Sequence, residues 1–173
     1  LYHTFGKVQT NLLVEGFYTI LDDVFALRDM DDAADGGKVK ERYNGSGATV
    51  RGFNVEGRAA FTRWFELQAG VTLQQSRYKE PEFWSEDAEV PPVRRMFRTP
   101  DAYGYFTASF KPVRNFTADL SGTCTGSMLV QHMAGSGVAQ DVAVSTPSFF
   151  DMNIRLSYDV RIYKEITMQL YGG

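Results

Sequence analysis

Three short turns alternate with three long loops along the chain, and segments of alternating polarity join them. The turns are placed at 61–65, 110–116 and 158–163, each bracketed by aromatic residues. The loops run roughly over 31–47, 79–100 and 132–147. This pattern is typical of an outer-membrane β-barrel, with short turns on the periplasmic side and long loops on the extracellular side.

The composition fits a folded protein. The 173 residues are 43% hydrophobic, 14% aromatic and 23% charged, with a net charge of −3. Disordered chains have few aromatics and a strong net charge, so disorder is excluded. The chain has no basic stripe, and no nucleic-acid partner is expected. No apolar run approaches the roughly 20 residues of a transmembrane helix, but a barrel needs none, because lipid contacts only every second residue of a strand.

Splitting each segment into its two faces separates apolar from polar side chains. In the segment from Phe116 to Thr125, the apolar face carries Leu120 while the opposite face carries Asp119 and Ser121. The alternation predicts about seven strands, near 8–22, 50–62, 65–76, 102–110, 116–128, 149–159 and 166–171. The predicted fold class is therefore all-β, an antiparallel up-and-down transmembrane barrel segment belonging to a larger barrel.

Several charged residues fall in the middle of these strands, on the polar face. A dry protein core does not tolerate unpaired charges, whereas a wet or plugged lumen does. We therefore expect the following side chains to face a lumen: Glu56, Arg58, Asp119, Asp151 and Arg155. Aromatic residues gather at the short-turn ends of the strands, where a membrane barrel places an aromatic girdle.

The loop over 79–100 is the candidate binding surface. It holds four of the six prolines together with aromatic and basic residues. A proline-stiffened loop loses less entropy when it binds a ligand. The expected ligand-binding residues are Tyr78, Phe83, Trp84, Arg94, Arg95 and Arg98. An equally weighted alternative is that Phe83 and Trp84 pack against neighbouring loops.

The acidic run 29–37 invites a calcium-binding interpretation, but Ala33 and Ala34 stand where an EF-hand places ligands. His3 and His132 are far apart and the single cysteine, Cys124, has no cysteine partner, so no metal site is expected. No nucleophile elbow or triad pattern is visible, and we expect neither enzymatic activity nor a cofactor.

Four segments resemble the C-terminal barrel strands of TonB-dependent outer-membrane receptors, and more closely the siderophore and cobalamin receptors than the glycan importers. They lie at 11–19, 48–56, 103–112 and 119–128, and the resemblance covers nearly the whole chain. It implies a barrel of about 22 strands around a plug. On this basis residues 1–173 are expected to be a partial barrel that lacks the plug and the closing strand. Position 124 is often aromatic in the family, and Cys124 removes one ring from the outer girdle.

The resemblance implies active import of a scarce nutrient, such as a ferric siderophore, haem or cobalamin, across the bacterial outer membrane. The implied partners are a TonB-type energy-coupling protein, acting through the absent plug, the lipid bilayer and a small-molecule chelate or cofactor as ligand. Two alternatives remain open. One is a complete small barrel, either an adhesin or a membrane hydrolase, and the other is a soluble lipocalin-like binding protein.

Overall fold

The computed structural model describes residues 1–30, 39–85 and 87–173, and every regular element in them is a β-strand. One antiparallel sheet holds nine strands in the order β1-β2-β5-β6-β8-β9-β12-β13, with β7 beside β6. They are β1 (Tyr2–Phe5), β2 (Val8–Leu21), β5 (Ala48–Thr62), β6 (Phe65–Glu82), β7 (Val93–Arg95), β8 (Ala102–Phe110), β9 (Phe116–Thr125), β12 (Phe149–Tyr163) and β13 (Ile166–Gly172). The predicted all-β antiparallel fold class is confirmed.

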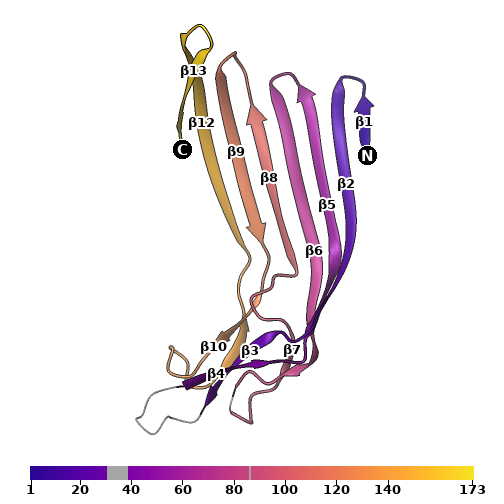
Figure 1. The fold of residues 1–173 in the computed structure, drawn as a ribbon, viewed down its shortest axis with the longest axis vertical. Helices are drawn as coiled ribbons and strands as arrows, with labels where there is room; N and C mark the ends of the chain where they lie inside the picture. The colour runs from indigo at the N-terminus through magenta and orange to yellow at the C-terminus, as the bar shows by residue number, and fades with distance from the viewer. Residues whose placement is uncertain (31–38, 86) are drawn as a thin grey trace.

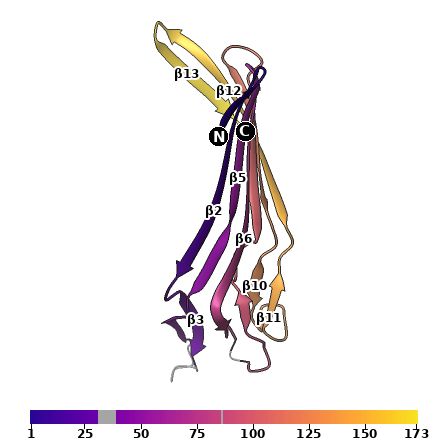
Figure 2. The same cartoon turned by 90° about the vertical axis from the view of Figure 1, so that its right-hand side faces the viewer.

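The sheet is open, with β1 at one edge and β13 at the other (Figure 1). All tight turns lie at one end of the strands and all long connections at the other. Seen from the side, the hairpin of β12 and β13 leans away from the other strands at the tight-turn end (Figure 2). The up-and-down order is the one predicted, but the path contains one strand more than the expected seven.

The additional strand and one misplaced turn are the main differences from the prediction. β1 pairs with β2 through a tight turn in which Gly6 adopts a φ of 63°, a conformation open to glycine. The turn expected at 158–163 is wrong, because that segment stays in β12 and Val160 pairs with Met168. The chain reverses only after Tyr163, at Lys164 with a φ of 39°. β-branched residues at 160 and 162 favour the extended strand.

The long loops contain short strands of their own. β3 (Phe25–Met30) pairs with β4 (Val39–Asn44), and β10 (Leu129–His132) pairs with β11 (Val142–Ser145). β6 continues to Glu82, well beyond the expected end of its strand near 76. Residues 31–38, which include most of the run 29–37 considered for calcium, lie outside the described residues.

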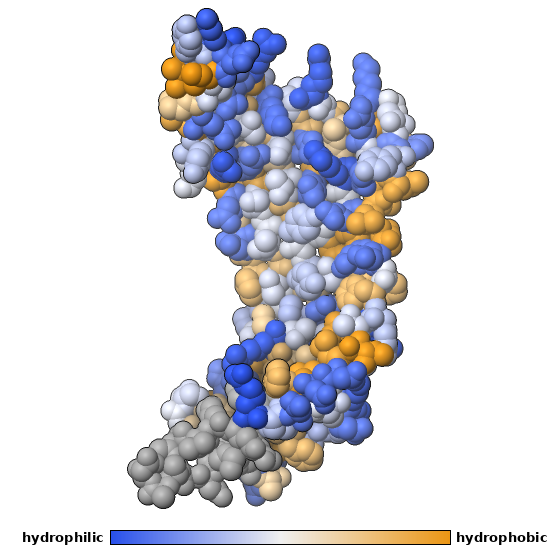
Figure 3. All heavy atoms as spheres, in the orientation of Figure 1, coloured by the Kyte–Doolittle hydropathy of each residue, from blue (hydrophilic) through white to orange (hydrophobic). Residues whose placement is uncertain are grey.

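The two faces of the sheet differ sharply in polarity. Apolar side chains that occupy one face are widely exposed, including Phe53 (64%), Ile154 (57%) and Leu73 (55%). Among the described residues only Ala48 and Trp84 are buried hydrophobics. Hydrophilic residues dominate much of the surface in Figure 3, with hydrophobic patches toward one edge and the loop end. The sheet by itself therefore has no hydrophobic core. No described helix is long and apolar enough to cross a membrane.

Aromatic rings gather at the tight-turn end, where they make direct contacts. Phe61 stacks on Phe65 with ring centroids 5.6 Å apart. Trp64 meets Phe110 edge to face at 5.1 Å. These rings come from two consecutive turns, so the aromatic cluster ties β5, β6 and β8 together at this end of the sheet.

Candidate functional site

The five charged residues expected to face a lumen all lie on one face of the sheet. The register places Arg155 opposite Asp119, and Asp119 opposite Ser109. Asp151 and Arg155 share a face because they lie four residues apart on the same strand. Glu56 and Arg58 reach this face through their pairing with β6, which pairs in turn with β8. The register thus puts them on one surface, and its placement in a lumen stays a prediction.

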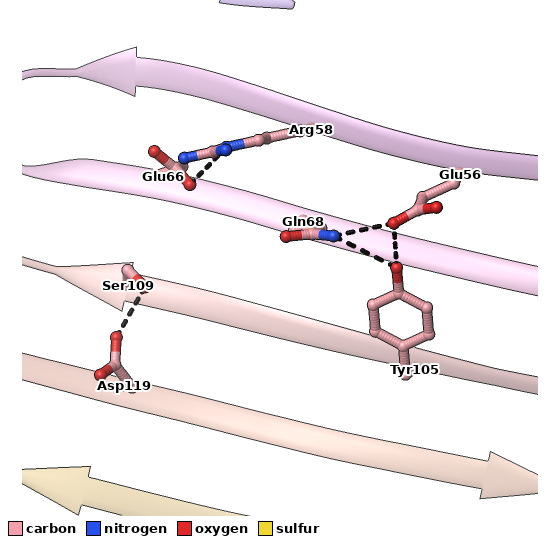
Figure 4. Close-up of polar contacts among 7 residues, drawn as sticks. All are labelled: Glu56, Arg58, Glu66, Gln68, Tyr105, Ser109 and Asp119. Carbon is pink, nitrogen blue, oxygen red and sulfur yellow. Dashed lines mark hydrogen bonds and ion pairs between the residues drawn. The ribbon is translucent and has the colours of Figure 1, made fainter. Parts of the chain in front are cut away.

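Hydrogen bonds connect the polar residues across four neighbouring strands (Figure 4). The Glu56 carboxylate accepts hydrogen bonds from the Tyr105 hydroxyl and from Gln68 Nε2, the latter at 2.8 Å. Arg58 forms an ion pair with Glu66 at 2.7 Å. Ser109 Oγ donates to Asp119 at 2.6 Å. The polar face therefore presents linked side chains that satisfy one another while remaining accessible.

A cavity of about 240 Å³ lies at the loop end, beyond this face. Its walls come from the segments 24–25 and 45–47, from the end of β6, and from the loops that contribute Phe97, Arg98 and Gln131. Three of the predicted ligand-binding residues, Tyr78, Trp84 and Arg98, line it. Their role in ligand binding stays a prediction.

The polar lining of the cavity includes the donors Tyr78, Trp84 and Arg98 together with the Glu82 carboxylate. Trp84 is 7% exposed, and its buried Nε1 has no partner among the described residues. Burial raises the pKa of the Tyr78 phenol, the Glu82 carboxylate adds to the rise, and a hydrogen bond with the Phe97 backbone opposes it. Tyr78 therefore remains protonated at neutral pH, and its hydroxyl is available as a donor. The Tyr43 hydroxyl donates to Glu82 Oε1 at 2.7 Å.

The three predicted arginines have different surroundings. Arg94 donates to the backbone oxygen of Lys79 at 3.1 Å. Arg95 pairs with Asp101 at 2.9 Å and donates to the Ser127 backbone oxygen at 2.8 Å. Arg98 lines the cavity, and its own backbone N–H is fixed by the Leu129 oxygen at 2.8 Å. Arg95 is thus held by a carboxylate and a backbone oxygen, Arg94 makes one hydrogen bond outside the cavity, and Arg98 belongs to the cavity wall.

The two adjacent aromatics of the loop separate in the structure. Trp84 is buried and packs edge to face on Phe97, with ring centroids 5.5 Å apart. Phe83 is 71% exposed. Trp84 therefore packs on a ring of its own loop, while the Phe83 ring is exposed.

The third loop is fastened to the second by Asp141. One carboxylate oxygen accepts from Ser85 Oγ and the other from the Ala134 backbone N–H, both at 2.7 Å. The hydrogen bond from Ala134, reinforced by the one from Ser85, lowers the pKa of Asp141. Asp141 thus holds two long loops in a fixed relation beside the cavity.

Sequence reasoning missed several members of both arrangements. The predicted set contained charged side chains only and so omitted Gln68 and Tyr105, although the two-residue alternation places both on the polar faces of their strands. Glu82, Phe97 and Gln131 reach the cavity only because three separate loops converge. Gly47, with a φ of 86°, contributes a backbone oxygen to Lys79 at 3.0 Å, which no side-chain pattern reveals.

The arrangement is suited to binding. Its donors favour a ligand with oxygen acceptors or negative charge, since charge-assisted hydrogen bonds to arginine are the strong ones. A volume of about 240 Å³ is below the range of roughly 300–1,000 Å³ common for sites of drug-sized ligands. The cavity therefore fits a small ligand or one part of a larger one. In the described part of the chain, no group of His, Cys, Asp and Glu is arranged to hold a metal ion.

The fold is similar to those of solved structures, two of which are a copper transporter and a siderophore receptor. The copper transporter OprC aligns with a TM-score of 0.60 at 10% identity, over 98% of this chain and 23% of that one. The siderophore receptor PirA from Acinetobacter baumannii aligns with a TM-score of 0.52 at 11% identity, over 98% of this chain and 26% of that one. The chain thus spans about a quarter of each.

These likenesses concern the fold. Both structures are TonB-dependent receptors, and this chain has the fold of a segment of such a receptor barrel. The predicted resemblance is confirmed at that level. No protein-family model and no curated protein sequence matches the chain.

Proposed function

We propose that this chain forms part of the barrel wall of a TonB-dependent outer-membrane receptor that imports a scarce nutrient. The observation that carries the proposal is the open sheet with one exposed apolar face and one polar, hydrogen-bonded face. Exposed apolar area on this scale needs a partner, and lipid on one side with a wet interior on the other satisfies both faces. The fold shared with two transport proteins supports this placement.

In this proposal the bilayer of the bacterial outer membrane contacts the apolar face, and the long loops are extracellular. A TonB-type energy-coupling protein acts through a plug domain, which this sheet and the other strands of the barrel enclose. The reaction is transport, with no covalent chemistry. The polar face, with Glu56, Arg58, Asp119, Asp151 and Arg155, lines the interior through which the ligand passes.

The ligand binds at the loop end, where Tyr78, Trp84 and Arg98 line one cavity. Their donors favour an anionic ligand, and a ferric siderophore, haem or cobalamin offers carboxylate, hydroxamate or phosphate oxygens to such groups. Phe83, exposed beside the cavity, supplies a ring for stacking. Arg94 and Arg95 support the loop from outside the cavity.

Deletion of residues 79–100 in the intact protein tests the proposal. We expect uptake to be abolished while the barrel still folds, measured as growth on single iron or cobalamin sources. A finer test is Arg98→Gln, which should weaken ligand binding about tenfold or more, as loss of a charge-assisted hydrogen bond does. Arg94→Gln is the matched control and should leave affinity nearly unchanged. Unaltered uptake after the loop deletion contradicts the proposal.

The two alternatives fit the observations less well. A lipocalin-like protein encloses its ligand with an inward apolar face, whereas Phe150, Met152 and Ile154 are each 57% exposed on an open sheet. A complete small barrel closes on itself, whereas β1 and β13 are free edges here. Partition of the intact protein between detergent and water separates the membrane proposal from the soluble one.

A further inference from the structure

The apolar face changes character abruptly at its loop end, on β5 and β6. Phe53 pairs with Leu73 in the last apolar rung. The next rung on the same face pairs Arg51 with Gln75, and the one after it places Arg77 opposite Thr49. Side chains two residues apart on a strand share a face, so Arg51 and Arg77 follow directly above exposed apolar side chains.

Neither arginine has an acidic partner among the described residues. Arg51 donates from Nη2 to the neutral amide oxygen of Gln75 at 2.7 Å. Two other basic residues at this end are neutralised by carboxylates, since Lys79 pairs with Asp22 and Arg95 with Asp101. No described carboxylate therefore pairs with Arg51 or Arg77, and both side chains are exposed at the border of the apolar face.

A hollow of about 610 Å³ lies at the same border. Gly16, Phe53 and Leu73 line its apolar part, while Arg51, Gln75 and Tyr18 line its polar part. Asp101 also borders it, but Arg95 holds that carboxylate at 2.9 Å. Diagonal neighbours across a strand pair are about 7–8 Å apart, so the long side chains of Arg51 and Arg77 can converge on one anion.

We propose that Arg51 and Arg77 bind the phosphate group of a membrane lipid whose acyl chain lies over Phe53 and Leu73. The charge complementarity is direct, because arginine binds phosphate through paired N–H donors. The apolar part of the hollow accommodates hydrocarbon, and Tyr18, which pairs with Arg51, is of the residue type that favours a membrane interface. The site lies on the apolar face of the sheet, opposite the polar face that carries Glu56 and Arg58. It rests on the proposed membrane placement of the sheet and is independent of nutrient import.

The test measures binding of diphosphoryl lipid A to the intact protein in detergent micelles by native mass spectrometry. The double variant R51Q/R77Q should bind about tenfold more weakly, as expected for two interfacial cations. The matched control R63Q/R114Q removes two arginines from the tight turns, with the same change in net charge, and should keep the affinity of the parent. Heat-modifiable electrophoresis confirms that both variants are folded.

Comparison lipids make the test independent of the variants. The unmodified protein should bind dephosphorylated lipid A about tenfold more weakly than the diphosphoryl form. The lipid site is overturned if the two lipids bind equally or if both double variants lose the same affinity. It is also overturned if inorganic phosphate displaces lipid A as well as free lipid A does, or if a second copy of the chain occupies this face. If the protein fails to enter micelles, the membrane placement itself fails. Loss of nutrient uptake alone leaves the lipid site standing.

Discussion

Trp84, at the loop end, is 7% exposed, whereas Phe53 and Phe150, on the strands, are 64% and 57% exposed. The loop end thus packs part of its apolar surface against itself, through Trp84 and Phe97. The strands leave their apolar side chains uncovered. Within the sheet, hydrogen bonds satisfy only their backbone groups and the side chains of the polar face. The loops therefore carry local structure of their own, while the strands depend on what surrounds the sheet.

The largest expected effect comes from removing the local packing of the loop end. Trp84→Ala should destabilise this region by about 3–5 kcal/mol, the usual cost of deleting a buried tryptophan. Because the ring packs on Phe97 within the same loop, the loss should appear as faster hydrogen exchange in residues 79–100, with barrel melting nearly unchanged.

Phe83→Ala is the matched control for Trp84→Ala, since the neighbouring ring is 71% exposed. The free energy of local opening of residues 79–100, measured by hydrogen exchange, should stay within about 0.5 kcal/mol of that in the parent protein. Equal acceleration in both variants contradicts a distinction between the two aromatics. A collapse of the whole barrel in Trp84→Ala contradicts the independence of the loop end.

The next effect tests the dependence of the strands on lipid. Ile154 lies opposite Leu120 in mid-strand, on the apolar face. Ile154→Arg should destabilise the intact protein in lipid vesicles by about 2–4 kcal/mol, as a charge on the lipid face near the bilayer centre does. Denaturant titration of the refolded protein measures this difference.

Asn153→Arg provides the comparison one residue away. Asn153 pairs with Ser121 on the polar face, so the same new charge should change stability by less than about 0.5 kcal/mol. If both substitutions are equally costly, the two faces do not have different surroundings, and the membrane placement is wrong.

Much of the strand region was predictable from the sequence because a strand has a strict two-residue period. The segment 102–110 was predicted with the bounds of β8, and 116–128 was close to β9. The turn at Lys164 was misplaced because the aromatics Tyr158 and Tyr163 looked like a turn boundary, although the intervening residues continue the ladder of β12.

The loop end was less predictable, since its cavity depends on contacts between segments far apart in the chain. Composition singled out Tyr78, Trp84 and Arg98, but it did not separate Arg98 from Arg94 and Arg95. Only the paired positions of Lys79, Asp101 and Ser127 make that separation. Local pattern fixes which face a strand residue occupies, whereas loop geometry decides which neighbour a loop residue meets.

The smallest expected effect concerns the hydrogen bonds by which Asp141 links the two loops. Its folded-state pKa lies below the ordinary 3.8, so its stabilising contribution is present above that value and is lost as the pH falls through the folded-state pKa. Hydrogen exchange of the segment containing Ala134, corrected for intrinsic rates, should accelerate as the pH falls below the ordinary 3.8 and through the folded-state pKa. In Asp141→Asn this acceleration should disappear, because the amide does not titrate there. An acceleration of the same size in that variant means that other carboxyl groups hold the loops together.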